Sequence, residues 1–108
     1  MVNIRIYRDT AGRVCRFAAE GHSDFAPYGE DIVCAAVSVL LQTAILGLEE
    51  LAQAKPDVTM TDGCLECRLS AGKGDDIVID TILQTMLLGL QAIEADYAAF
   101  VSVSQIGV

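Results

Sequence analysis

The segment from Asp31 to Ala54 constrains the fold most, because it contains no proline and is rich in alanine and leucine. Lys55 and Pro56 follow it and favour a sharp end. This composition predicts a long helix. Its longest run of apolar or small residues, 32–41, has ten residues, whereas a membrane-spanning helix needs about 20. We therefore expect a mostly buried core helix and no membrane segment.

Apolar and polar residues alternate at the start of the chain. Val2, Ile4 and Ile6 recur at every second position, which is the period of a strand with one buried face. Turn-forming residues follow at 9–13, and residues 14–19 can return as a second strand. We therefore expect an N-terminal hairpin.

A second hairpin is predicted in the middle of the chain. Residues 58–61 and 65–69 have strand character and flank Asp62 and Gly63, a pair that suits a tight type I′ turn. The Ala-Gly-Lys-Gly stretch at 71–74 lacks a full phosphate-binding pattern, so we interpret it as a flexible connection.

A second helix follows, capped by Asp75 or Asp76, and runs to about Tyr97. Its apolar face consists of residues at helical spacing: Ile79, Ile82, Leu83, Met86, Leu87, Leu90 and Ile93. Residues 100–103 allow a short final strand. The order ββαββα(β), in a single domain of residues 1–108, predicts an α+β fold. We expect an α/β sandwich of a mainly antiparallel sheet and two helices.

The acidic composition limits the partners. The chain has 15 acidic and 7 basic side chains and a formal net charge of -8. This balance argues against direct nucleic-acid binding through a basic face. The net negative charge suits a basic protein or peptide partner. Alternatively, it only keeps the protein soluble. The N-terminus lacks the continuous apolar region of a signal peptide, so we expect a cytoplasmic protein with free thiols.

His22 is the only histidine and lies twelve positions before Cys34. Cys34 falls in the first turn of the predicted helix, where free backbone N–H groups and the helix dipole stabilise a thiolate. An imidazole close to such a thiol can accept its proton and later protonate a leaving amine. The pair thus has the character of a nucleophile and its base. Alternatively, Cys34 is a small core residue and His22 an ordinary surface residue.

Asp31 and Ser38 are candidates for supporting roles. Asp31 could orient the imidazole of His22, or could cap the helix by accepting the backbone N–H of Cys34. We favour the cap, which would withdraw that N–H from an oxyanion hole. Ser38 lies one turn after Cys34 in a polar stripe that continues to Gln42. Its hydroxyl could bond within the site or to its own helix backbone.

The segment that carries His22 and leads to Cys34 contains Gly21, Tyr28 and Gly29. The glycines supply backbone freedom, and Pro27 stiffens the middle of the loop. The loop could therefore act as a lid over a bound peptide, or be an ordinary mobile connection.

Cys64 and Cys67 have the spacing of a metal-binding pair. A zinc site needs about four ligands, and no second pair of this kind occurs in the sequence. The predicted strand also places the two thiols on opposite faces. We therefore expect no metal site.

Residues 21–40, Gly-His-Ser-Asp-Phe-Ala-Pro-Tyr-Gly-Glu-Asp-Ile-Val-Cys-Ala-Ala-Val-Ser-Val-Leu, closely resemble the signature of the ribosomal-processing cysteine protease family, Prp. Residues 82–97 look like the second helix of that family. The resemblance spans nearly the whole chain. It implies that Cys34 is the nucleophile and His22 the base or proton donor.

The resemblance further implies a bacterial cytoplasmic endopeptidase that forms homodimers and needs no metal or organic cofactor. The implied substrate is the N-terminal extension of large-subunit ribosomal protein twenty-seven, with an apolar, Phe-containing segment before the cut. Its removal would support ribosome assembly. Two other hypotheses stay open. One is a non-catalytic, ribosome-associated module that binds peptides, and the other is redox sensing through a reversible disulfide of Cys34.

Overall fold

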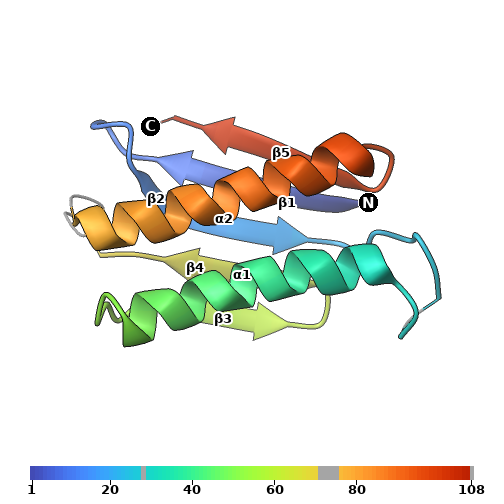
Figure 1. Cartoon of the computed structure of the whole chain (residues 1–108), viewed down its shortest axis with the longest axis horizontal. Helices are drawn as coiled ribbons and strands as arrows, with labels where there is room; N and C mark the ends of the chain where they lie inside the picture. Colours follow the sequence, from blue (N-terminus) through green and yellow to red (C-terminus); the bar gives the residue numbers. More distant parts are fainter. Residues whose placement is uncertain (28, 71–75, 108) are drawn as a thin grey trace.

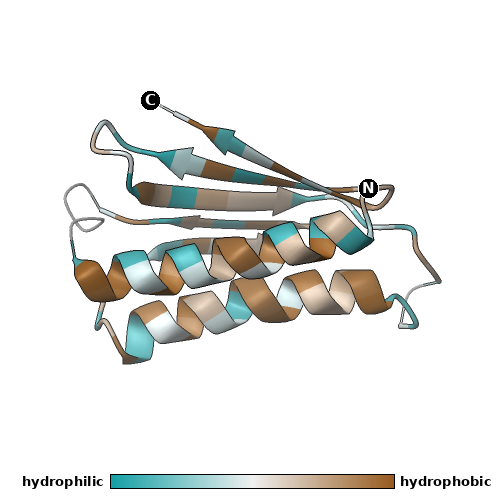
Figure 2. Ribbon diagram, turned by 45° about the horizontal axis from the view of Figure 1, so that its top comes forward, coloured by the Kyte–Doolittle hydropathy of each residue, from teal (hydrophilic) through white to brown (hydrophobic). Residues whose placement is uncertain are grey.

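The computed structural model describes residues 1–27, 29–70 and 76–107. Five strands form one sheet, and both helices cover the same face of it (Figure 1, Figure 2). The elements in chain order are β1 Val2–Arg8, β2 Val14–Glu20, α1 Ile32–Glu50, β3 Asp57–Thr61, β4 Cys64–Arg68, α2 Ile77–Asp96 and β5 Val101–Ile106. This two-layer arrangement confirms the predicted α+β sandwich and its element order.

The strand order in the sheet is β3-β4-β2-β1-β5. β1 and β5 run parallel, while the other neighbouring strands are antiparallel, so the sheet is mainly antiparallel as predicted. β5 is longer than the predicted 100–103, because its backbone pairs with β1 from Val2↔Val101 to Tyr7↔Ile106. That pairing joins the two ends of the chain and is not encoded in any local pattern.

The core lies between the sheet and the helices. Val2, Ile4 and Ile6 of β1 point into it, as their alternation predicts, and Phe17 of β2 is buried beside them. The helices contribute Val33, Val37, Leu41, Ala44, Ile45, Leu48, Ile79, Leu83, Met86, Leu87 and Leu90. Burial of this side of α1 fixes the rotation of the helix about its axis. It thereby leaves Cys34 at the border of the core, only partly buried.

α1 ends at Glu50, earlier than the predicted Ala54. Gln53 has a positive φ of 51°, and the Ala54 N–H donates to the carbonyl of Leu48 at 2.8 Å. The chain therefore turns back over the last helical turn, although helix propensity alone would extend the helix to the proline.

The β3–β4 hairpin has a two-residue turn of Asp62 and Gly63, and both strands begin one residue earlier than predicted. Gly63 has a φ of 74°, whereas Asp62 is not among the residues with positive φ. A type I′ turn needs positive φ at both positions. The predicted hairpin is therefore confirmed, but the predicted turn type is wrong.

α2 begins after Asp76, whose carboxylate accepts the N–H groups of Val78 and Ile79. Asp76 is thus the cap of this helix, one of the two residues predicted for that role. The other candidate, Asp75, and the predicted connection at 71–74 lie outside the described residues.

Both helices are long and apolar enough to cross a membrane, judged by length and composition alone. α1 reaches this length because it continues beyond the ten-residue apolar run of the sequence. The apolar side of each helix packs against the sheet, which a core helix of a two-layer fold also requires. The prediction that α1 is mostly buried is wrong, because Ile32, Val39 and Leu46 on its other side are exposed. The absence of a membrane segment stays a prediction.

Candidate active site

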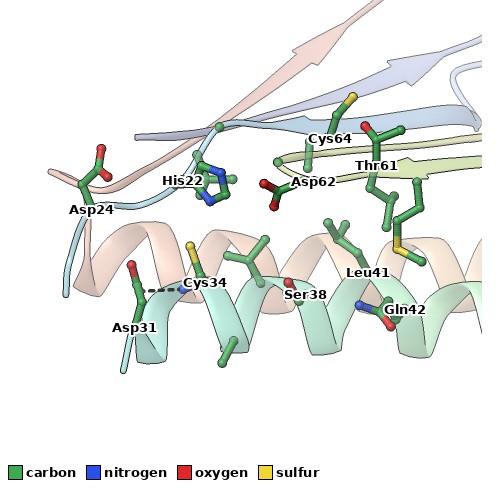
Figure 3. Close-up of a pocket in the computed structure, with 18 of the residues that line it drawn as sticks. His22, Asp24, Asp31, Cys34, Ser38, Leu41, Gln42, Thr61, Asp62 and Cys64 are labelled. Atoms are coloured by element: carbon green, nitrogen blue, oxygen red, sulfur yellow. Dashed lines mark hydrogen bonds between the residues drawn. The ribbon is translucent and has the colours of Figure 1, made fainter. Parts of the chain in front are cut away.

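A cleft of about 620 Å³ opens beside the N-terminal half of α1. Its walls are α1, the end of β2 with the loop that follows, and the turn between β3 and β4 (Figure 3). Cys34 lies on the helical wall and His22 on the wall opposite (Figure 3). The other predicted site residues that line the cleft are Gly21, Gly29, Asp31 and Ser38. Tyr28 lies outside the described residues.

The start of α1 fixes the position of Cys34. Asp31 is the N-cap, and its Oδ1 accepts the backbone N–H of Cys34 at 2.9 Å (Figure 3). The predicted cap is therefore confirmed, and no hydrogen bond between described residues joins Asp31 to His22. The cap therefore occupies the N–H of Cys34, which is no longer available to a substrate oxygen.

Ser23 joins the helix cap to the thiol, and sequence reasoning missed it. Ser23 is only 2% exposed. Its backbone N–H donates to Cys34 Sγ at 3.2 Å, and the thiol donates to Ser23 Oγ at 3.4 Å. The Ser23 hydroxyl in turn donates to Asp31 Oδ2. No local pattern in the sequence predicts these contacts, because Asp31 and Cys34 lie eight and eleven residues further along the chain.

The position of His22 depends on the neighbouring turn. The Gly21 N–H donates to the carbonyl of Gly63 at 2.8 Å, which ties the end of β2 to the β3–β4 turn. Gly21 has a φ of 96°, and a Cβ there would collide with the carbonyl of Met1. The imidazole of His22 lies against Gly63, where a Cβ would be 2.9 Å from Nε2. Among the described residues no hydrogen bond joins His22 to Cys34, although both face the same cleft (Figure 3).

The cleft is acidic. Asp24, Asp31 and Asp62 line it, and none of the described lining residues is lysine or arginine. Burial raises the pKa of Asp31, but hydrogen bonds from the Ser23 hydroxyl and from Cys34 outweigh burial and lower this pKa to about 2. Asp31 is therefore ionised at neutral pH. The summed negative charge suits a basic peptide.

Ser38 and Gln42 continue along the cleft wall from Cys34, as the polar stripe in the sequence predicts (Figure 3). Within the described part of the chain, the Ser38 hydroxyl bonds neither to Cys34 nor to its own helix. It is exposed to the cleft. Gly29 has a φ of 88°, a left-handed backbone conformation that favours glycine, as expected for this loop.

Phe25 anchors the loop that carries His22 and Ser23. Its ring packs edge-on against Tyr97 and Phe100, with centroids 5.7 and 5.3 Å apart. Its backbone N–H donates to Asp31 Oδ2 at 3.2 Å. No signal in the sequence predicts this anchor, since its aromatic partners lie far along the chain.

The four cysteines are free thiols. Cys64 contributes to the cleft lining, but its sulfur points away from the cleft (Figure 3), whereas Cys67 is buried in the core. Burial raises the pKa of Cys67 to about 12. The outward direction of the Cys64 sulfur and the burial of Cys67 disfavour a disulfide of either residue with Cys34. Among the described residues, no group of three or more His, Cys, Asp or Glu could hold a metal ion.

Comparison with known proteins gives matches over almost the full chain. The family model described as cysteine protease Prp matches residues 1–102. The ribosomal processing cysteine protease Prp of Staphylococcus aureus is 32% identical over 97 residues, which covers 90% of this chain and 92% of that protein.

Solved structures of similar sequence have the same fold as this chain. The S. aureus Prp protease with a covalently linked product peptide has a TM-score of 0.91 and 31% identity, covering 97% of this chain and 99% of that one. SMU.848 from Streptococcus mutans has a TM-score of 0.88 and 28% identity, covering 100% of this chain and 96% of that one. The chain therefore belongs to the Prp family of cysteine proteases.

Proposed function

We propose that Cys34 is the nucleophile and His22 the proton carrier of an endopeptidase that processes a ribosomal protein. The observation that carries the proposal is the placement of these two side chains on opposite walls of one acidic cleft (Figure 3). The covalently linked product peptide in the S. aureus relative supports a covalent mechanism.

The catalytic cycle follows from the chemistry of the two groups. His22 takes the proton of the Cys34 thiol, and the thiolate attacks the scissile carbonyl carbon. The resulting oxyanion accepts hydrogen bonds from backbone N–H groups at the start of α1. The imidazolium then protonates the leaving amine, which leaves a thioester on Cys34. Water, deprotonated by His22, hydrolyses this thioester and regenerates the thiol.

The proposed substrate is the N-terminal extension of large-subunit ribosomal protein twenty-seven, and the proposed location is the bacterial cytoplasm. The substrate rests on the family resemblance and on the ribosomal processing role in the names of the S. aureus relatives. The aspartates of the cleft add a physical reason, because ribosomal proteins are basic and opposite charge raises the association rate.

We also propose a homodimer. Ile32, Val39 and Leu46 recur every seven residues on the outer side of α1, and Leu88 lies on the outer side of α2. Each is at least 58% exposed, and an apolar stripe of this kind is typical of a contact between helices. Leu46→Glu should yield a monomer in light scattering. The control Ser104→Glu on β5 should remain dimeric, and a monomeric wild type would reject the proposal.

Cleavage of a peptide that spans the extension and the first residues after it tests the proposed activity. The wild-type protein should cut at one bond, while Cys34→Ala and His22→Ala should lose most of the activity. Cys64→Ala serves as the control, because this thiol points away from the cleft (Figure 3). Full cleavage by Cys34→Ala would reject the mechanism. Peptide binding without cleavage by the wild-type protein would favour the non-catalytic module.

A further inference from the structure

Ser23 closes a ring of hydrogen bonds at the nucleophile. The backbone N–H of Cys34 donates to Asp31 Oδ1, and the other oxygen of that carboxylate accepts the Ser23 hydroxyl. The Ser23 oxygen in turn accepts the Cys34 thiol at 3.4 Å. Because Ser23 is 2% exposed, water does not compete readily for these bonds.

The direction of the Ser23 hydroxyl distinguishes the two protonation states of the nucleophile. A hydroxyl has one hydrogen, and here that hydrogen goes to the ionised Asp31. The oxygen therefore presents a lone pair to Cys34 Sγ, and the same oxygen also accepts the Phe25 N–H at 3.4 Å. Lone pairs can accept a thiol S–H but repel a thiolate. The Ser23 backbone N–H, 3.2 Å from the sulfur, has the opposite effect, since a donor suits the anion.

We propose that Ser23 is a positioning residue that holds Cys34 as a neutral thiol in the free enzyme by linking it to Asp31. Once His22 has taken the proton, the Ser23 backbone N–H stabilises the thiolate. The inference rests on the proposed role of Cys34 as the nucleophile. The hydrogen bond to Ser23 would therefore keep Cys34 protonated until a peptide in the cleft brings the imidazole of His22 close to the sulfur.

Alkylation of Cys34 by iodoacetamide, resolved by peptide mass spectrometry from about pH 6 to about pH 10, tests the inference without substrate. Ser23→Ala removes the acceptor, so alkylation at the acidic end should be about three- to tenfold faster than in the wild type. The two rates should converge at the alkaline end, where both proteins hold the thiolate. Ser23→Thr, which keeps the hydroxyl, should restore the wild-type profile.

A rate that changes by the same factor at every pH would indicate a merely structural role for Ser23 and would overturn the inference. An unchanged or slower rate at the acidic end would also overturn it. A double-mutant cycle with Asp31→Asn is independent of how well threonine fits. The effect of Ser23→Ala should shrink in the Asp31→Asn background, and additive effects would contradict the link between the two residues.

The test is separate from that of the proposed function. Alkylation reports the hydrogen bonds of Cys34 in the free protein, whereas peptide cleavage by Cys34→Ala reports whether this thiol is the nucleophile. An alkylation result that rejects the role of Ser23 would therefore leave the proposed role of Cys34 as the nucleophile intact.

Discussion

Replacing Gly63 by alanine should displace His22 with little harm to the fold. The new Cβ would lie 2.9 Å from His22 Nε2, so the ring must retreat to the 3.4 Å at which ordinary van der Waals contact begins. A displacement of about 1 Å at a catalytic group can cost roughly 100-fold in rate. For this smaller shift we expect a fall in kcat/KM of roughly tenfold, measured with a fluorogenic peptide that spans the cleavage site.

The backbone cost of the substitution has a matched control. Gly63 has a φ of 74° and Gly12, in the β1–β2 turn, has a φ of 80°. Alanine in this left-handed region costs about 1–2 kcal/mol of folding free energy, but a Cβ at Gly12 meets no atom within 4 Å. Gly12→Ala and Gly63→Ala should therefore lose similar stability in urea unfolding, and only Gly63→Ala should lose activity. Equal activity in the two variants would refute the assigned role of His22.

Three further predictions concern charge and the anchored loop. The folded-state pKa of Asp31 is about 2, below the ordinary 3.8. The stability advantage of wild type over Asp31→Asn in urea unfolding should therefore be full above about pH 5 and fade as the pH falls towards about 2; a constant difference would contradict the hydrogen-bond account. Phe25→Leu removes two edge-on aromatic contacts and should cost about 1–2 kcal/mol while raising KM, whereas an unchanged KM would mean that the anchor does not shape the cleft. Since the cleft is lined by aspartates, kcat/KM for a basic peptide should fall as salt rises, and equal salt sensitivity for a neutral peptide would exclude electrostatic attraction.

Local patterns in the sequence were sufficient to predict most elements of the fold. The alternation of Val2, Ile4 and Ile6 identified β1, and Asp31 was correctly expected as the cap of α1. The full length of β5 was not predictable, because it depends on pairing with β1 at the other end of the chain. The end of α1 was also missed, since the turn at Gln53 runs against helix propensity.

In the candidate site, too, local sequence patterns predict the position of one residue, whereas contacts between distant segments determine the positions of others. The position of Cys34 follows from the helix start, which a cap and the apolar pattern can locate. The environment of His22 does not, because it depends on contact with Gly63 in a distant hairpin. Ser23 lies beside His22 in the sequence, yet its hydrogen bonds form only when the loop folds back to bring it to Asp31 and Cys34.

The most direct test of the account is to identify which thiol reacts with a substrate-like electrophile. A peptide chloromethyl ketone carrying the sequence before the cleavage site should modify the protein once, and mass mapping should place the adduct on Cys34. The reaction should slow markedly in His22→Ala, while the buried Cys67 stays unmodified. An adduct on Cys15, Cys64 or Cys67, or peptide cleavage that survives full modification of Cys34, would contradict the central claim.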